Sequence, residues 1–104
     1  MMQPHPHSKM VLWDYPKGKT TLSMNAGESK TFIFTILFLD GTLDTTTYEL
    51  YNNNTMVDSG NMSGDSGHLT ITLSDLTRGG YWLYTTYTTS KNEVIKDTWY
   101  VLVS

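Results

Sequence analysis

Apolar side chains in this chain recur at every second residue over short runs, and not at the spacing of a helix. From His68 to Ser74 the alternation is regular, with Leu69, Ile71 and Leu73 on one face and polar residues on the other. No window of about a dozen residues places apolar side chains three and four positions apart, as an amphipathic helix requires. The pattern therefore predicts a chain built from β-strands.

The composition agrees with this prediction. Threonine occurs 17 times, tyrosine 7 times and alanine once. Thr and Tyr fit the pleated, half-buried surface of a sheet, and the best helix formers are scarce. A length of 104 residues suits one ordinary domain. We therefore expect an all-β fold, a two-sheet β-sandwich of about seven to eight antiparallel strands.

Clusters of Gly, Asn, Asp and Ser separate the runs and mark the turns. The predicted strands span residues 10–14, 19–24, 30–39, 45–51, 55–59, 68–74, 81–89 and 94–103. Residues 60–67 are polar and rich in Gly, which predicts a loop. Residues 1–9 are polar and contain two prolines, which predicts a flexible N-terminal arm. The expected organisation is this arm followed by one sandwich domain over residues 10–104.

Several predicted strands carry large apolar side chains on both faces, although a sandwich gives each strand only one inner face. Three interpretations remain open: aromatic pairs covered by neighbouring side chains, a protein-contact surface, or a platform on which sugar rings stack. The residues expected to contact protein are Phe34, Phe38, Tyr87, Tyr100 and Leu102. The residues expected to stack on sugars are Trp13, Trp82 and Tyr84, with Asn52 to Asn54 or Asp58 as hydrogen-bonding partners.

The overall composition argues against several classes of function. Cysteine is absent, which removes disulfides, thiol catalysis and cysteine metal sites. The net charge of −3 offers no basic patch, so we expect no nucleic-acid partner. No apolar run approaches the roughly 20 residues of a membrane span, and we expect no membrane partner.

The motifs that suggest chemistry are better explained as turns. Gly64-Asp65-Ser66-Gly67 is similar to a serine-protease motif, but His68 stands where those enzymes need another glycine. His5 and His7 lack a third ligand, and the aspartates in the predicted turns do not have the spacing of an EF-hand. We therefore expect no enzymatic activity, no metal and no cofactor.

The segment from Ser74 to Tyr81 connects two predicted strands and contains Leu76 and Gly79. It resembles the corner of immunoglobulin-like domains, where a Leu, a Gly and a Tyr precede the penultimate strand. The resemblance implies that the hydroxyl of Tyr81 hydrogen-bonds back to the preceding connection. Tyr81 is thus the expected structural residue of this corner.

The layout of residues 28–103 also resembles the small immunoglobulin-like domains of tailed-phage and prophage structural proteins, in particular the N-terminal domains of baseplate upper proteins. The matching features are the run Lys30 to Ile36, the Asp40-Gly41 turn, the hairpin from Tyr48 to Val57 and the Val-rich closing strand. The resemblance implies a non-catalytic tail, baseplate or particle-decorating protein. Its partners would be other virion proteins or a second copy in a homo-oligomer.

Two further expectations accompany this resemblance. The location would be the virion, or the host cytoplasm during assembly, because the first ten residues contain no apolar segment typical of a secretion signal. The alternative function is a carbohydrate- or cell-surface-binding module that uses exposed aromatic side chains.

Overall fold

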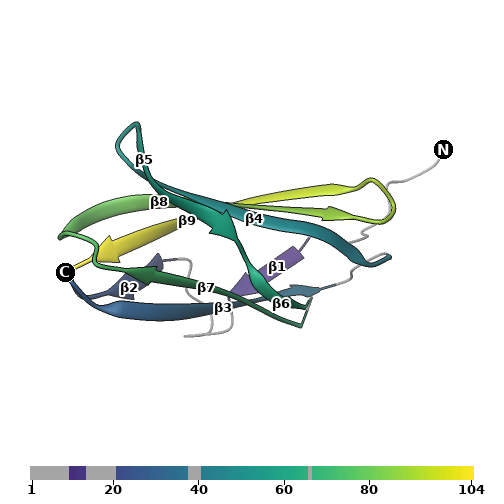
Figure 1. The fold of residues 1–104 in the computed structure, drawn as a ribbon, viewed down its shortest axis with the longest axis horizontal. Helices are drawn as coiled ribbons and strands as arrows, with labels where there is room; N and C mark the ends of the chain where they lie inside the picture. Colours follow the sequence, from purple (N-terminus) through teal and green to yellow (C-terminus); the bar gives the residue numbers. More distant parts are fainter. Residues whose placement is uncertain (1–9, 14–20, 38–40, 66) are drawn as a thin grey trace.

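The computed structural model describes residues 10–13, 21–37, 41–65 and 67–104, which form nine strands in two sheets (Figure 1). One sheet has the order β1-β3-β7-β6 and contains β1 (Met10–Trp13), β3 (Ser29–Leu37), β7 (His68–Ser74) and β6 (Ser63–Asp65). The other has the order β2-β9-β8-β4-β5 and contains β2 (Thr21–Met24), β9 (Val94–Val103), β8 (Gly79–Thr89), β4 (Leu43–Asn52) and β5 (Thr55–Asn61). The fold is an immunoglobulin-like β-sandwich. The described residues include no helix long and apolar enough to cross a bilayer.

Eight of the nine strands lie where the sequence predicts them. β7 and β9 match their predicted bounds residue for residue. The one strand that was not predicted, β6, lies within the predicted loop 60–67 and pairs with the first half of β7. One pairing departs from the antiparallel arrangement, because β2 runs parallel to β9.

The core lies between the inner faces of the two sheets and is mainly aliphatic and aromatic. Phe34 on β3 packs against Trp99 on β9, with their ring centroids 5.0 Å apart. Tyr87 lies on the inner face of β8, like Leu83. Phe34 and Tyr87 are both 0% exposed, so their predicted role as surface contacts is wrong. In strands that are apolar on both faces, the pattern does not say which face turns inward.

Two polar atoms on the inner face of the five-stranded sheet have no hydrogen-bond partner among the residues that the structure describes: the Tyr87 hydroxyl and Asp97 Oδ2. Burial raises the pKa of both groups, and the negative charge of Asp97 adds to the rise for Tyr87. The nearby Thr85 hydroxyl partly opposes the rise in the pKa of Tyr87, although its position does not meet the geometry of a hydrogen bond to the Tyr87 hydroxyl. The Thr85 hydroxyl oxygen accepts a hydrogen bond of 3.2 Å from Trp99 Nε1. The core is therefore well packed but incompletely hydrogen-bonded at this point.

Asparagines allow two of the tight turns between strands. Asn53 adopts a φ of 56° between β4 and β5, and Asn92 adopts a φ of 61° between β8 and β9. Asn tolerates this left-handed conformation better than most residues. Both turns were predicted from the sequence, and they set the registers of the two hairpins.

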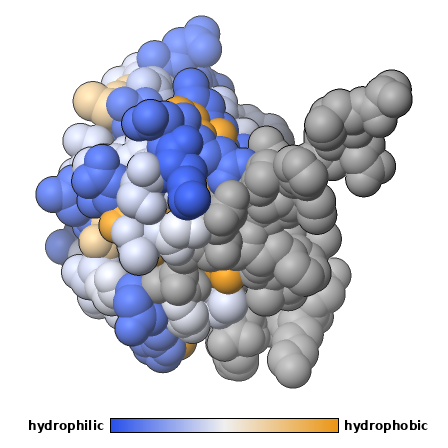
Figure 2. All heavy atoms as spheres, turned by 90° about the vertical axis from the view of Figure 1, so that its right-hand side faces the viewer, coloured by the Kyte–Doolittle hydropathy of each residue, from blue (hydrophilic) through white to orange (hydrophobic). Residues whose placement is uncertain are grey.

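Figure 2 shows the end of the sandwich that carries the β8–β9 turn. Where the residues are described, this end is mainly hydrophilic, with only small separate hydrophobic spots. Val94, which is 53% exposed, begins β9 close to this turn. The larger group of exposed aromatic side chains lies elsewhere, on the outer face of the five-stranded sheet.

Candidate functional site

Four aromatic side chains lie on the outer face of the five-stranded sheet: Tyr51 on β4, Trp82 and Tyr84 on β8, and Tyr100 on β9. The register places Tyr51 opposite Trp82, and Trp82 opposite Tyr100, so three of them form a row across the sheet. Tyr84 lies two residues along β8 and so shares this face. We call these four side chains the aromatic surface.

Ring contacts join the four side chains in two pairs. The ring centroids of Tyr51 and Tyr84 are 5.5 Å apart, and those of Trp82 and Tyr100 are 5.0 Å apart. Both pairs have the favourable edge-to-face geometry. Trp82 and Tyr84 are nevertheless 44% and 40% exposed. A partner that binds these pre-oriented rings loses little side-chain entropy on association.

Gly80 makes room for Tyr100 within this arrangement. A Cβ atom at Gly80 would collide with the Tyr100 hydroxyl and lie 2.8 Å from its Cζ. The Tyr100 ring therefore covers the backbone of β8 at a position without a side chain. The glycine thus fixes where this ring lies and shapes one side of the aromatic surface.

An open cavity of about 580 Å³ adjoins the aromatic surface. Besides Gly80 and the exposed rings, its lining includes Asn53 and Asn54 from the β4–β5 turn. The tip of this hairpin rises above β8 (Figure 1). The cavity therefore combines aromatic faces with two amide groups that both donate and accept hydrogen bonds.

Two exposed aliphatic side chains lie next to the aromatic surface. Leu102 is 42% exposed and follows Tyr100 by two residues on the same face of β9. Met56 on β5 is 50% exposed and lies opposite Tyr51 in the register. Together with the four rings they form one continuous apolar patch across the strands β9, β8, β4 and β5.

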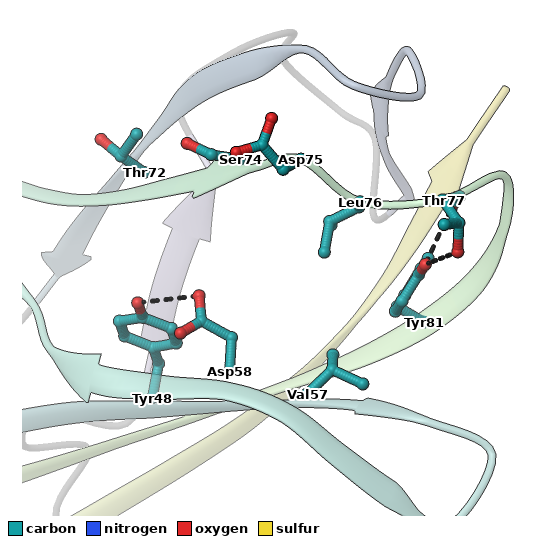
Figure 3. Close-up of a pocket in the computed structure, with 9 residues that line it drawn as sticks. All are labelled: Tyr48, Val57, Asp58, Thr72, Ser74, Asp75, Leu76, Thr77 and Tyr81. Atoms are coloured by element: carbon teal, nitrogen blue, oxygen red, sulfur yellow. Dashed lines mark hydrogen bonds between the residues drawn. The ribbon is translucent and has the colours of Figure 1, made fainter.

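A second cavity, of about 590 Å³, opens between the two sheets (Figure 3). We call it the edge groove, and it is lined by Tyr48, Val57, Asp58, Thr72, Ser74, Asp75, Leu76, Thr77 and Tyr81. The Tyr48 hydroxyl donates a hydrogen bond of 3.2 Å to Asp58 Oδ2. Burial, and then the charge of Asp58, raise the pKa of Tyr48, which stays a neutral donor at pH 7.

Tyr81 forms the corner at one end of the edge groove. Its hydroxyl donates to the backbone carbonyl of Thr77 at 2.7 Å and lies 3.0 Å from the Thr77 hydroxyl (Figure 3). This is the contact back to the preceding connection that the sequence resemblance implies for Tyr81. The residue is 2% exposed, so it supports the fold and does not offer a binding group.

The structure brings only part of the predicted site together. Trp82 and Tyr84, chosen for sugars, lie beside Tyr100 and Leu102, chosen for protein, in a single patch. Phe38 lies outside the described residues, and so does the side chain of Trp13. Asp58 faces the edge groove rather than the aromatic surface, because it lies opposite the inward-facing Leu50.

The sequence interpretation missed Tyr51 and Met56. Their signal was present in the predicted hairpin, since two strands joined by a short turn place Tyr51 and Met56 near each other. What the sequence could not supply was the pairing of β4 with β8, which brings Tyr51 beside Trp82. Within the described part of the chain, no three His, Cys, Asp or Glu side chains lie close enough to hold a metal ion.

Comparisons with known proteins establish the fold. No family model matches the chain, and a search of curated proteins also gives no match. Among solved structures, CopC from Methylosinus trichosporium OB3b matches with a TM-score of 0.64 and 13% identity, over 83% of this chain and 85% of CopC. The fibronectin(III)-like modules of CbhA from Clostridium thermocellum match with a TM-score of 0.59 and 12% identity, over 91% of this chain and 97% of the other.

An endo-beta-1,4-mannanase from Thermotoga petrophila also matches, with a TM-score of 0.69 and 8% identity. The match covers 96% of this chain but only 20% of the mannanase. The same fold thus occurs both in fibronectin(III)-like modules and within a much longer enzyme. At these identities the likeness shows the immunoglobulin-like sandwich and assigns no activity.

Proposed function

We propose that this chain is a non-catalytic interaction domain that binds another protein through the aromatic surface together with Leu102 and Met56. The observation that supports the proposal is the continuous patch of partly exposed, pre-oriented rings. The cores of protein interfaces are enriched in Tyr, Trp and Met, and these residue types make up most of the patch. The hydroxyl of Tyr51 donates a hydrogen bond of 3.2 Å to Glu49 Oε1. The carboxylate beside the patch therefore already has a hydrogen-bond partner within the chain.

The finer form of the proposal is that the partner is a second copy of this chain, or another tail protein, in a phage or prophage particle. It rests on the layout of residues 28–103 and on the two-sided strands. The solved structures named above do not tie the chain to phage proteins. A closed oligomer would bury the patch on each copy and leave no unpaired apolar face.

Light scattering on a sizing column, over a hundredfold range of protein concentration, tests the self-association that we propose. We expect an oligomer whose mass falls to that of a monomer in Trp82→Ala and Tyr100→Ala. Val94→Ala is the matched control, because Val94 is an exposed apolar residue on β9 outside the patch. A wild-type monomer at every concentration, or equal effects of all three variants, would contradict self-association.

A second candidate function, carbohydrate binding, is favoured by one specific observation. Asn53 and Asn54 line the same cavity as Trp82 and Tyr84, and amide groups both donate hydrogen bonds to sugar hydroxyls and accept them. Titration of the protein with a panel of oligosaccharides tests this function through tryptophan fluorescence. A saturable change that Trp82→Phe abolishes would favour carbohydrate over protein. No change with any oligosaccharide in the panel would count against it.

A further inference from the structure

The second half of β7 has an open edge. On one side, β7 pairs with β3 as far as Ser74. On the other side, β6 pairs only with the residues from His68 to Thr70. In the part of the chain that the structure describes, no strand continues this pairing along the rest of β7. Among the described residues, Ile71–Ser74 therefore form an unpaired edge of the four-stranded sheet.

The hydrogen-bonding pattern shows which backbone groups point out of this edge. Along an antiparallel strand, successive residues bond alternately to one neighbour and to the other. Asp75 N donates to Glu28 O at 3.3 Å, so Asp75 and Leu73, two residues earlier, bond on the β3 side. Thr72 and Ser74 consequently direct their N–H and C=O groups away from β3, toward the open edge. Such groups form a template for another strand.

The edge groove lies directly beside this open edge (Figure 3). Thr72 and Ser74 line it from β7, and Val57 and Asp58 line it from β5 on the other side. Leu76 points into the space between them (Figure 3). A cavity of about 590 Å³ has room for side chains from a strand that docks on β7.

The charges in the edge groove are all negative. Asp58 and Asp75 are the charged residues among the described residues that line it, and no Lys, Arg or His is among them. The Asp58 carboxylate lies across the space from β7, whereas the exposed Asp75 lies at the rim, with its carboxylate on the far side of β7 (Figure 3). Asp58 is held by the Tyr48 hydroxyl and by the backbone N–H of Ser59. No hydrogen bond or ion pair engages the Asp75 carboxylate within the described residues. The described lining thus has one carboxylate facing the space and one at its rim, with no basic residue, next to apolar surface from Val57 and Leu76.

We propose that the edge groove binds an extended, basic peptide of a partner protein, which adds a strand to the open edge of β7. The backbone of the peptide would bond to Thr72 and Ser74, as in other complexes formed by strand addition. Leu73 is fully buried and faces inward, so the peptide residue opposite it enters the groove. A Lys or Arg there places its aliphatic stem against Val57 and Leu76 and its charge beside Asp58.

This binding site is independent of the proposed function, because the aromatic surface lies on the outer face of the five-stranded sheet. A fluorescein-labelled heptapeptide, Thr-Val-Thr-Lys-Thr-Val-Thr, supplies the probe, since its alternation directs Val, Lys and Val to one face. The matched peptide carries Glu in place of Lys. We expect saturable binding of the Lys peptide by fluorescence anisotropy, and at least tenfold weaker binding of the Glu peptide.

The variants Asp58→Asn and Asp75→Asn test the recognition of charge. We expect each to weaken binding of the Lys peptide about fivefold or more, and Asp44→Asn, an exposed control outside the groove, to leave it unchanged. Asp75 makes no side-chain hydrogen bond that its substitution would break, so a loss in that variant is not a loss of folding. Equal binding of the two peptides, or no effect of either groove variant, would overturn the proposal.

Amide hydrogen exchange locates the bound peptide. We expect the amides of Thr72 and Ser74 to exchange more slowly when the Lys peptide is bound, because they would then donate to its backbone. Protection confined to β8 and β9 would place the peptide on the aromatic surface and refute the proposed site. Protection of Thr72 and Ser74 that rises with protein concentration alone would show that a second copy occupies the edge, and would also overturn the proposal.

Discussion

The corner formed by Tyr81 offers a quantitative test of what stabilises this sandwich. Tyr81→Phe keeps the buried ring and removes only the hydroxyl, which donates to the Thr77 carbonyl at 2.7 Å. A hydrogen bond of this kind contributes about 0.5–1.5 kcal/mol net, and we place this short bond at the upper end of that range. We therefore expect the free energy of unfolding to fall by about 1.5 kcal/mol. For a domain of this size that loss lowers Tm by roughly 6 to 12 °C.

Urea unfolding, followed by circular dichroism and by tryptophan fluorescence, to which the buried Trp99 contributes, measures this change. Tyr100→Phe is the matched control, because its hydroxyl makes no hydrogen bond within the described residues and should change stability by less than about 0.5 kcal/mol. Thr77→Val removes the hydroxyl that lies 3.0 Å from Tyr81 but keeps the carbonyl, so we expect an intermediate loss. If Tyr81→Phe lost no more stability than Tyr100→Phe, the reasoning about the corner would be refuted.

Three further predictions concern the core and the short strand β6. Tyr87→Phe removes a buried hydroxyl that has no hydrogen-bond partner among the described residues, so the free energy of unfolding should rise by about 1 kcal/mol, with a higher urea midpoint. A lower midpoint would mean that the hydroxyl is bonded. Burial raises the pKa of Asp97 above 3.8, so the native protein binds its proton more tightly than the unfolded chain does. The free energy of unfolding of the wild-type protein should therefore fall as pH rises from about 4 through the native pKa of Asp97. Urea midpoints measured over the same pH range should fall less for Asp97→Asn than for the wild-type protein. Gly64 has a φ of 105°, which alanine rarely adopts, and a Cβ there would collide with the carbonyl oxygen of His68. Gly64→Ala should therefore lower Tm by more than roughly 8 °C in a thermal melt. An unchanged Tm would show that β6 tolerates the side chain.

The sequence was sufficient for the strands whose faces differ clearly. β7 alternates between fully buried side chains and partly or fully exposed ones, and turn-forming residues flank it, so its bounds followed from the pattern. β6 was missed because three residues, Ser63 to Asp65, carry no alternation of their own and become a strand only by pairing with β7. The parallel pairing of β2 with β9 was also not predictable, since a period of two contains no information about strand direction.

The candidate site could be predicted only in part, for a related reason. The outward position of Tyr100 and Leu102 followed from the alternation along β9, whereas on β8 the sequence assigned surface roles to Trp82 and Tyr84 on one face and to the buried Tyr87 on the other. Phe34 was placed outside because β3 is apolar on both faces, so its sequence does not say which face meets the core. The edge groove could not be predicted from the sequence, because it depends on where β6 stops pairing with β7 and on the position of β5 on its other side.

The parallel pairing of β2 and β9 has a mechanical consequence. The pairing extends beyond the strands, because Ser104 N donates to Met24 O at 3.0 Å and Ala26 N donates to Ser104 O at 2.9 Å. A pulling force that enters the chain before Thr21 and leaves it after Ser104 acts in opposite directions on two strands that point the same way. The force therefore shears all of their hydrogen bonds together instead of peeling them apart one at a time. A domain connected in this way holds its shape under tension along β2 and β9.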